Sequence, residues 1–316
     1  MIQVKDLTKD YGPRRAIDHL NFSVNKGDVV GFLGPNGAGK STTMKIITGF
    51  MAPSHGSASV AGFDVFENPI EVKKRIGYLP ETPPVYADMY VRDYLRYVAA
   101  LKQVPKDKIE KSVDMAVEKT NLGEVQKRLI QHLSKGFKQR VGIAQAIVSD
   151  PEVLILDEPT VGLDPKQVAE IRDLIKALRG QHTIILSTHI LPEVQATCEK
   201  IIIINKGKIV VEDSIHHLAT MEQGQNRLLV RVTKDVSDMK SVLSDIREVI
   251  AVQAGNSSKE WRIDVRGGDD IVAAVSARLV NQGMGLLEFT PSKMDLEDVF
   301  LKLTYGQSSE KHGGES

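Results

Sequence analysis

The chain has 316 residues, of which 41% are hydrophobic and 26% are charged. These shares are ordinary for globular proteins, so they exclude a largely disordered or fibrous chain, and the length corresponds to about two domains of ~150 residues each. Lys and Arg together number 41, as do Asp and Glu, and this balance excludes the strongly basic field on which nonspecific nucleic-acid binding depends, so no nucleic-acid partner is expected.

The predicted elements up to about residue 90, and again after residue 150, alternate between short apolar runs and longer segments of helical periodicity. This alternation is typical of an α/β core with a mainly parallel sheet. Four buried strands are predicted, at 28–33, 153–156, 183–187 and 201–204. The first three lead through a loop into predicted helices, at 40–48, 165–178 and 191–198. Ligands of such sheets bind at the carboxyl ends of the strands, so functional residues are expected there.

The segment from 91 to 149 interrupts this alternation. It contains three predicted helices with no strand between them, at 91–101, 106–120 and 135–148. We therefore expect a helical subdomain inserted into the α/β core, within a first domain that covers residues 1–222.

After about residue 223 the predicted order changes to strand, helix, strand, strand, helix, strand. This order suggests a small ferredoxin-like α+β domain over residues 223–305. Its strands are predicted at 227–232, 249–253, 261–265 and 285–290, and its helices at 236–244 and 271–281.

The end of the chain contains a further predicted helix and a polar tail. One face of this helix carries Leu296, Val299, Phe300 and Leu303, which we expect to pack on the small sheet. Residues 306–316 contain Gly, Ser and charged residues but no apolar ones, so disorder is expected there.

A glycine-rich run follows the first predicted strand and opens a helix, which is the context that a P-loop requires. The run reads Gly34, Pro35, Asn36, Gly37, Ala38, Gly39, Lys40, Ser41 and Thr42. Glycines let backbone N–H groups wrap phosphates, and the helix N-terminus adds partial positive charge. Lys40 would neutralise the β- and γ-phosphates of a bound nucleotide, and the Ser41 hydroxyl would ligate Mg²⁺. A purely structural glycine turn would need neither side chain.

Two adjacent carboxylates, Asp157 and Glu158, end the predicted strand at 153–156. Adjacent strand residues point in opposite directions, so the two acids need not have the same role. With a P-loop in the same chain, Asp157 is the expected partner of Mg²⁺, and Glu158 is placed to act as the general base on the attacking water. The alternative is that this acidic pair only begins a loop.

Residues 133–140 read Leu, Ser, Lys, Gly, Phe, Lys, Gln and Arg ahead of a predicted helix. Ser134 could simply cap that helix, but capping leaves Gly136, Gln139 and Arg140 unexplained. The run resembles a looser form of LSGGQ, the signature of ABC ATPases. The resemblance covers about residues 1–220, and it implies a P-loop NTPase core with an antiparallel β subdomain as well as the helical insert.

Further motifs carry the same resemblance. Asp164, within 162–165, lies in a segment similar to the D-loop, and His189 after a strand resembles the switch histidine that contacts the γ-phosphate. Tyr11 resembles the aromatic residue that stacks on adenine. Glu81 stands where most ABC ATPases carry a glutamine, so its expected metal contact would have different electrostatics.

Glu81, the LSKG form of the signature and the segment 162–167 are most similar to ABC-2 exporters, and especially to the gliding-motility ATP-binding family. The resemblance implies that two copies pair head to tail, with each ATP between the Lys40 loop of one copy and Ser134 and Gly136 of the other. ATP and Mg²⁺ would be the ligands, and a separate multi-span membrane permease would be the second partner.

The compartment follows from three further features. Cys198 is the single cysteine, so no disulfide can form within the chain and a reducing environment is expected. Residues 1–6 show no apolar stretch of signal-peptide type, and the most apolar runs are far shorter than the ~20 residues that cross a bilayer. We therefore expect a cytoplasmic chain that lies on the inner face of the cell membrane through its permease.

Two alternatives to the function of a transporter subunit stay open. They are a soluble ABC ATPase with a non-transport partner and a regulatory cassette without activity.

Overall fold

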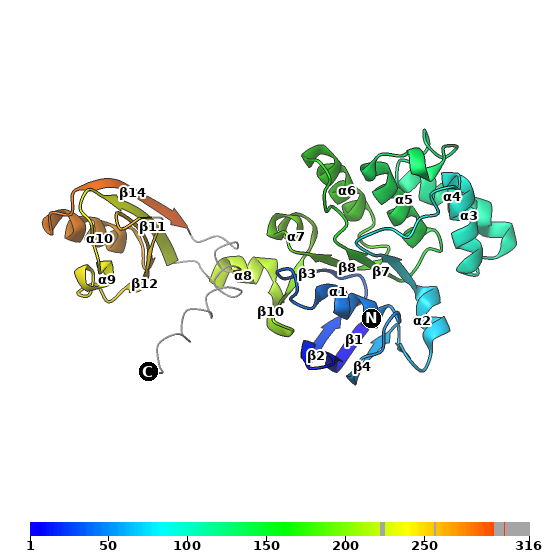
Figure 1. Ribbon diagram of the computed structural model, residues 1–316, viewed down its shortest axis with the longest axis horizontal. Helices are drawn as coiled ribbons and strands as arrows, with labels where there is room; N and C mark the ends of the chain where they lie inside the picture. Colours follow the sequence, from blue (N-terminus) through cyan, green and yellow to red (C-terminus); the bar gives the residue numbers. More distant parts are fainter. Residues whose placement is uncertain (222–224, 256, 294–299, 301–316) are drawn as a thin grey trace. The chain divides into compact units, whose positions relative to one another are not determined.

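The computed structural model describes residues 1–221, 225–255, 257–293 and 300 (Figure 1). Two compact units, Met1–Ile215 and His216–Ser316, divide the chain. The boundary between the units follows Ile215, so it lies before the boundary that the sequence predicts between residues 222 and 223. Helix α8 (Ile215–Met221) begins at the observed boundary. The two functional domains expected from the sequence stay a prediction.

The first unit is built around a six-stranded sheet of order β10-β9-β3-β8-β7-β6. Its strands are β3 (Val29–Leu33), β6 (Ile76–Leu79), β7 (Val153–Asp157), β8 (Thr183–Thr188), β9 (Lys200–Asn205) and β10 (Lys208–Ser214). All neighbours pair in parallel except β10, which is antiparallel to β9. Every residue of β3, β7 and β8 is buried, as expected for strands covered on both faces. The four strands predicted from apolar runs are all present.

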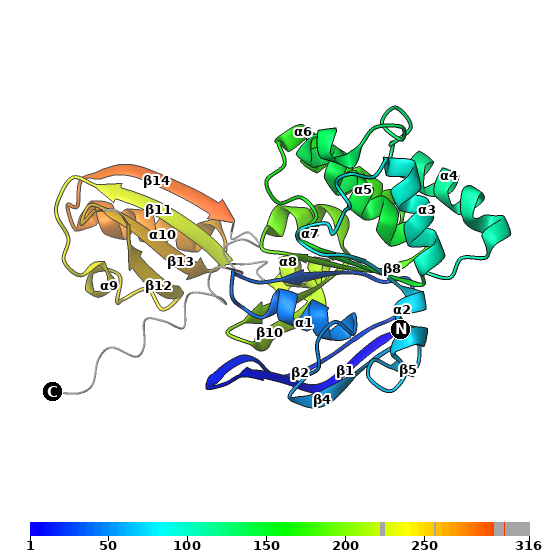
Figure 2. The same ribbon diagram turned by 45° about the vertical axis from the view of Figure 1, so that its right-hand side comes forward.

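A second, antiparallel sheet packs below the first one and has the order β2-β1-β4-β5. Its strands are β1 (Ile2–Tyr11), β2 (Arg14–Val24), β4 (His55–Val60) and β5 (Phe63–Asp64). Helix α1 (Lys40–Ile47) lies between the two sheets, and α5 (Lys135–Ile147) and α6 (Pro165–Ala177) cover the opposite face of the parallel sheet (Figure 2). The structure therefore confirms a P-loop type α/β core with an antiparallel β subdomain.

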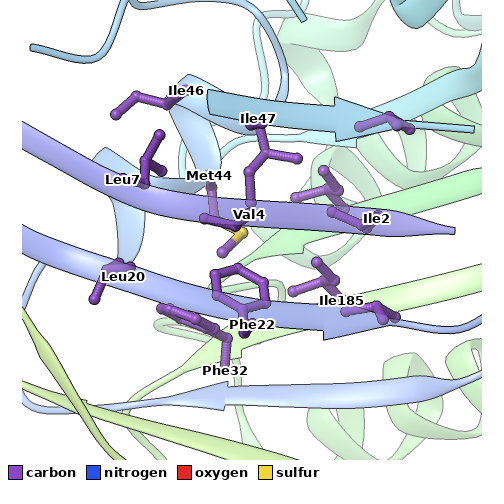
Figure 3. Close-up of a cluster of buried hydrophobic side chains, with 14 of the residues drawn as sticks. Ile2, Val4, Leu7, Leu20, Phe22, Phe32, Met44, Ile46, Ile47 and Ile185 are labelled. Carbon is purple, nitrogen blue, oxygen red and sulfur yellow. The ribbon is translucent and has the colours of Figure 1, made fainter. Parts of the chain in front are cut away.

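An apolar core joins the two sheets (Figure 3). Phe22 of β2 and Phe32 of β3 face one another with ring centroids 5.6 Å apart, and Met44 and Ile47 of α1 fill the space beside them. The side chain of Phe32 is fully buried. Because burial of one large apolar side chain contributes about 1.5–3 kcal/mol, this layer fixes α1 firmly at the end of β3.

The helical insert contains α3 (Val91–Leu101), α4 (Ile109–Lys119) and α5 (Lys135–Ile147). The expected helix 106–120 starts as a 3₁₀ turn, Lys106–Lys108, and becomes α-helical at Ile109. On the solvent side, Arg96 pairs with Glu110 at 2.7 Å and joins α3 to α4. The remaining helices of the first unit are α2 (Pro69–Arg75), α6 (Pro165–Ala177) and α7 (Leu191–Thr197).

The second unit has the βαββαβ order that the sequence predicts, with the sheet order β12-β13-β11-β14. Its elements are β11 (Gln225–Val232), α9 (Met239–Val242), β12 (Val249–Ala254), β13 (Glu260–Arg266), α10 (Asp269–Asn281) and β14 (Leu286–Lys293). All its strand pairs are antiparallel, and α10 covers one face of the sheet (Figure 1). This is the ferredoxin-like arrangement.

One helix of the second unit is shorter than expected. The sequence predicts a helix over 236–244, but α9 spans four residues. The Asp238 carboxylate accepts a hydrogen bond from the Ser241 backbone N–H, so the helix begins only after Asp238. The predicted face of Leu296, Val299 and Leu303 and the tail 306–316 lie outside the described residues, whereas Phe300 is buried. In the described part of the chain, no helix has the length and apolarity needed to cross a bilayer.

Cys198 ends α7 with a buried thiol, and burial raises its pKa to about 12. A thiol reacts as its thiolate, so at pH 8 we expect Ellman's reagent to modify the folded chain ~10³-fold or more slowly than the chain in denaturing urea. The absorbance of the coloured thiolate that the reagent releases measures both rates. Comparable rates in the two conditions would contradict the burial of Cys198.

Candidate functional site

The P-loop residues lie between the end of β3 and the start of α1. Gly39 is the N-cap of α1 with a φ of 113°, and Gly37 has a φ of 80°. Both angles lie in the left-handed region, which residues with a Cβ atom rarely adopt. The loop therefore turns back over the helix N-terminus, where the free backbone N–H groups favour an anion.

A cavity of about 540 Å³ opens at this edge of the parallel sheet. It is lined by Tyr11, Arg14, Ala16, Asn36, Gly37, Gly39, Lys40, Ser41, Thr42, Glu81, Glu158, Val161 and His189. The aromatic residue Tyr11, the P-loop, the proposed base Glu158 and the expected switch histidine His189 thus lie around one cavity. Gly34 and Ala38, also predicted to bind nucleotide, are buried behind it, and Pro35 is partly buried.

The carboxylate of Glu158 lies between two basic side chains. Its Oε1 is 3.3 Å from Lys40 Nζ, and its Oε2 is 2.9 Å from His189 Nδ1. Lys40 Nζ also donates to the Gly34 carbonyl at 2.8 Å. Lys40 and Glu158 are each 5% exposed, so neither charge is well solvated and each offsets the burial of the other.

Glu158 has a φ of 50°, which is uncommon for a residue with a side chain. Its backbone N–H donates to the Ser187 carbonyl at 2.8 Å, and its own carbonyl accepts from the Val161 N–H at 3.2 Å. These bonds hold the chain in this conformation directly after β7. Strained backbone of this kind is typical of functional positions.

Asp157 is buried at the end of β7. Its carboxylate accepts a hydrogen bond from Ser187 Oγ at 2.7 Å and interacts with the hydroxyl of Ser41. Burial raises the pKa of Asp157, while the hydrogen bonds from Ser187 and Ser41 oppose that rise. Glu81 is exposed at the cavity rim after β6. In the described part of the chain, no three His, Cys, Asp or Glu side chains gather as a protein-only metal site requires.

Three of the predicted nucleotide-binding residues lie elsewhere. Ser134, Gly136 and Asp164 line a second cavity of about 510 Å³, between the N-termini of α5 and α6. Ser134 Oγ accepts from the Phe137 N–H at 3.4 Å, and Asp164 Oδ1 accepts from the Gln167 N–H at 2.9 Å. Within one chain both side chains therefore act as helix caps, and the residues predicted to bind one nucleotide are divided between two cavities.

The sequence interpretation did not single out Arg14 and Val161, which also line the first cavity. Arg14 begins β2 directly after the turn that follows Tyr11, so a cation close to that tyrosine in sequence was the available signal. Val161 follows Glu158 closely, but nothing in its residue type marks it as functional.

Comparison with known protein families identifies proteins that are similar to this chain. Residues 17–161 match the family model described as ABC transporter. The chain is 35% identical over 308 residues to the bacitracin transport ATP-binding protein BcrA of Bacillus licheniformis, an alignment that covers 97% of this chain and 98% of that protein. It is 36% identical over 224 residues to the lantibiotic transport ATP-binding protein SrtF of Streptococcus pyogenes, covering 71% of this chain and 95% of that protein.

Solved structures give the same result. MJ0796, described as a bacterial ABC transporter cassette in a dimeric structure, superposes with a TM-score of 0.62 and 26% identity. The match covers 68% of this chain and 98% of that one. A likeness of this extent supports a common fold over about two thirds of the chain.

The P-loop glycines provide a matched pair of substitutions. A Cβ on Gly39 would lie 2.7 Å from Ile17 Cγ2 and 2.9 Å from the Ala16 carbonyl oxygen, whereas a Cβ on Gly37 would have no atom within 4 Å. Both positions have positive φ, so each Ala variant bears a strain of about 1–2 kcal/mol. We expect Gly39→Ala to lose a further ~1–3 kcal/mol of unfolding free energy through the clash.

Urea unfolding of the two variants, followed by circular dichroism, measures this difference. Gly37→Ala is the control, because it also places a Cβ at a positive φ but without the clash. Equal losses in the two variants would mean that the loop does not pack on Ile17 as described.

Proposed function

Because the chain belongs to the ATP-binding proteins of ABC transporters and is an ATPase, we propose that it drives an ABC-2 type exporter as a pair of identical chains bound to a separate membrane permease. The observation that carries this proposal is the single cavity shared by Lys40, Glu158 and His189 at the carboxyl edge of the parallel sheet.

In the proposed complex, ATP lies in the first cavity. Backbone N–H groups of the P-loop and the α1 N-terminus bind the phosphates, and Lys40 neutralises the β- and γ-phosphates. Tyr11 is 45% exposed at the rim, which leaves its ring accessible for stacking on adenine. Lys40 then exchanges part of its contact with Glu158 for phosphate oxygens.

The residues beside the P-loop fit a Mg²⁺ ion. Asp157 interacts with the hydroxyl of Ser41, and carboxylate and hydroxyl oxygens are the ligand types that Mg²⁺ prefers. Ser41 would bind the ion directly and Asp157 would support it, with Glu81 as a further carboxylate at the rim. Mg²⁺ would neutralise the negative charge of the phosphates.

Glu158 is proposed as the general base that takes a proton from the attacking water. His189, whose Nδ1 lies 2.9 Å from Glu158 Oε2, would orient that carboxylate and contact the γ-phosphate through its other ring nitrogen. The burial of Glu158 keeps bulk water away from the carboxylate, which strengthens each electrostatic contact in the site.

The pairing of two chains follows from the division of the site. Ser134 and Gly136 line a cavity of their own in each chain, so a second copy could present them to an ATP held by the first. The dimeric structure described for MJ0796 supports this arrangement. Asp164, at the same cavity, would lie at the boundary between the copies.

Export of an antibiotic peptide is the cargo class to test first, because the names of two relatives mention bacitracin and lantibiotic transport. The permease would hold the pair at the inner face of the cell membrane. The resemblance to gliding-motility ATP-binding proteins stays a prediction, to be tested by whether loss of this chain abolishes gliding of the host cell.

We expect Glu158→Gln to bind ATP but to lose steady-state hydrolysis by about 10²-fold or more, which is the scale of removing one catalytic group. The amide keeps the size and hydrogen-bonding capacity of the side chain but cannot accept the proton. Phosphate release measures turnover, and calorimetry measures ATP affinity. Near-normal turnover would refute the base assignment.

Lys40→Ala is the matched comparison, since it should fail earlier, at nucleotide binding. Unchanged ATP affinity in Lys40→Ala would count against the phosphate role of Lys40. A wild-type chain with no measurable hydrolysis would favour a regulatory cassette instead.

The transporter assignment predicts a membrane partner. We expect an affinity-tagged Glu158→Gln chain, solubilised from its host with mild detergent and ATP, to retain a multi-span membrane protein through purification and to run as two copies in sedimentation. The same preparation with ADP serves as the control. Recovery of ribosomal or DNA-repair proteins in place of a membrane protein would favour a soluble ABC ATPase.

A further inference from the structure

Glu193 is a buried carboxylate that none of the roles above uses. It is 6% exposed on α7, and it forms no ion pair with a Lys, Arg or His of the described part of the chain. Burying a carboxylate is unfavourable unless hydrogen bonds satisfy its oxygens. What satisfies Glu193 therefore indicates what the residue does.

Two threonine hydroxyls bind Glu193, one from the turn after β7 and one from the last residue of β8. Thr160 Oγ1 donates to Glu193 Oε1, and Thr188 Oγ1 donates to Glu193 Oε2 at 3.1 Å. Thr160 and Thr188 are buried as well. We call this group of Thr160, Thr188 and Glu193 the threonine clamp.

The threonine clamp connects the two loops that carry Glu158 and His189. Thr188 directly precedes His189, and its Oγ1 also accepts from the Ile190 N–H at 3.1 Å, so the side chain spans the turn that contains His189. Thr160 lies in the turn that starts at Glu158, and its carbonyl accepts from the Leu163 N–H at 3.2 Å. Both turns therefore have one common support behind the 2.9 Å contact between His189 and Glu158.

The support itself is rigid. Helix α7 packs directly on β3, since a Cβ on Gly31 would lie 2.3 Å from Cγ1 of Val194, the neighbour of Glu193. Glu193 is also in the first turn of α7, where a negative charge is favoured by the free N–H groups. An apolar side chain of this size would serve packing at least as well, so the carboxylate is best explained by the two loops that it joins.

We propose that Glu193 is a positioning residue for ATP hydrolysis. Through Thr160 and Thr188 it maintains the contact between the side chains of Glu158 and His189. The inference rests on the proposed roles of those two residues. It adds three positions to the site, none of which lines the first cavity.

Three substitutions remove the clamp one group at a time, namely Glu193→Met, Thr160→Val and Thr188→Val. Small misplacements of catalytic groups strongly slow the chemical step, so we expect each variant to lower kcat by about 10-fold or more. The KM for ATP should stay within about twofold, because the P-loop and Lys40, which bind the phosphates, are not part of the clamp. Thr160→Ser and Thr188→Ser keep the hydroxyl and should recover most of the loss.

Thr197→Val is the matched control. Thr197 is buried on the same helix, and the substitution is the same, but its hydroxyl has no part in the clamp. Circular dichroism melts show which variants fold. If Glu193→Met does not fold, the threonine variants decide the question; unchanged kcat in both of them, or an equal loss in Thr197→Val, would overturn the proposal.

A second measurement separates this proposal from the proposed function. In a chain with ¹³C-labelled histidine, the Cε1 resonance of His189, identified by its loss in His189→Gln, should shift in Thr160→Val and stay in place in Thr197→Val. If the His189 resonance shifts in Thr160→Val but the wild-type chain does not hydrolyse ATP, the clamp is supported and the proposed roles of Glu158 and His189 in hydrolysis are refuted. A resonance that stays in place in Thr160→Val would refute the clamp.

Discussion

The parallel pairing of β3, β8 and β7 is the constraint on which the site depends. Leu33 pairs with Thr188, and Asp157 pairs with Ser187, so the three strands end at nearly the same level. Neighbouring strands lie about 4.8 Å apart, which brings the loops after them within reach of one another. The short contacts among Lys40, Glu158 and His189 follow from this register, although long stretches of sequence separate the three residues.

Electrostatic interactions then give the charged side chains at these strand ends different surroundings. A buried lysine or glutamate alone would be strongly unfavourable, but Lys40 and Glu158 are buried together at 3.3 Å. Asp157, the last residue of β7, instead accepts a hydrogen bond from Ser187. One strand thus supplies two carboxylates with different surroundings, which is the condition for giving them different chemical roles.

The sequence predicted those parts of the fold that local patterns determine. Apolar runs identified the four buried parallel strands, and the glycine, lysine and hydroxyl spacing identified the loop that begins α1 at Lys40. The length of α9 was predicted incorrectly, because the cap formed by Asp238 is a local feature that apolar periodicity does not reveal. Arg14 was not predicted, although its closeness to Tyr11 in the sequence was a signal. Glu193 was not predicted, since only tertiary packing places this glutamate between two threonines.

The N-terminal caps of α5 and α6 have a kinetic consequence. With Ser134 and Asp164 in a cavity of their own, a chain in the proposed pair holds one half of each of two reaction centres. Dilution of the free chain would then slow its turnover faster than in proportion to concentration, because two molecules must meet for every productive event. A permease that holds both copies would remove this dependence and make the rate per complex independent of how scarce the chain is in the cell.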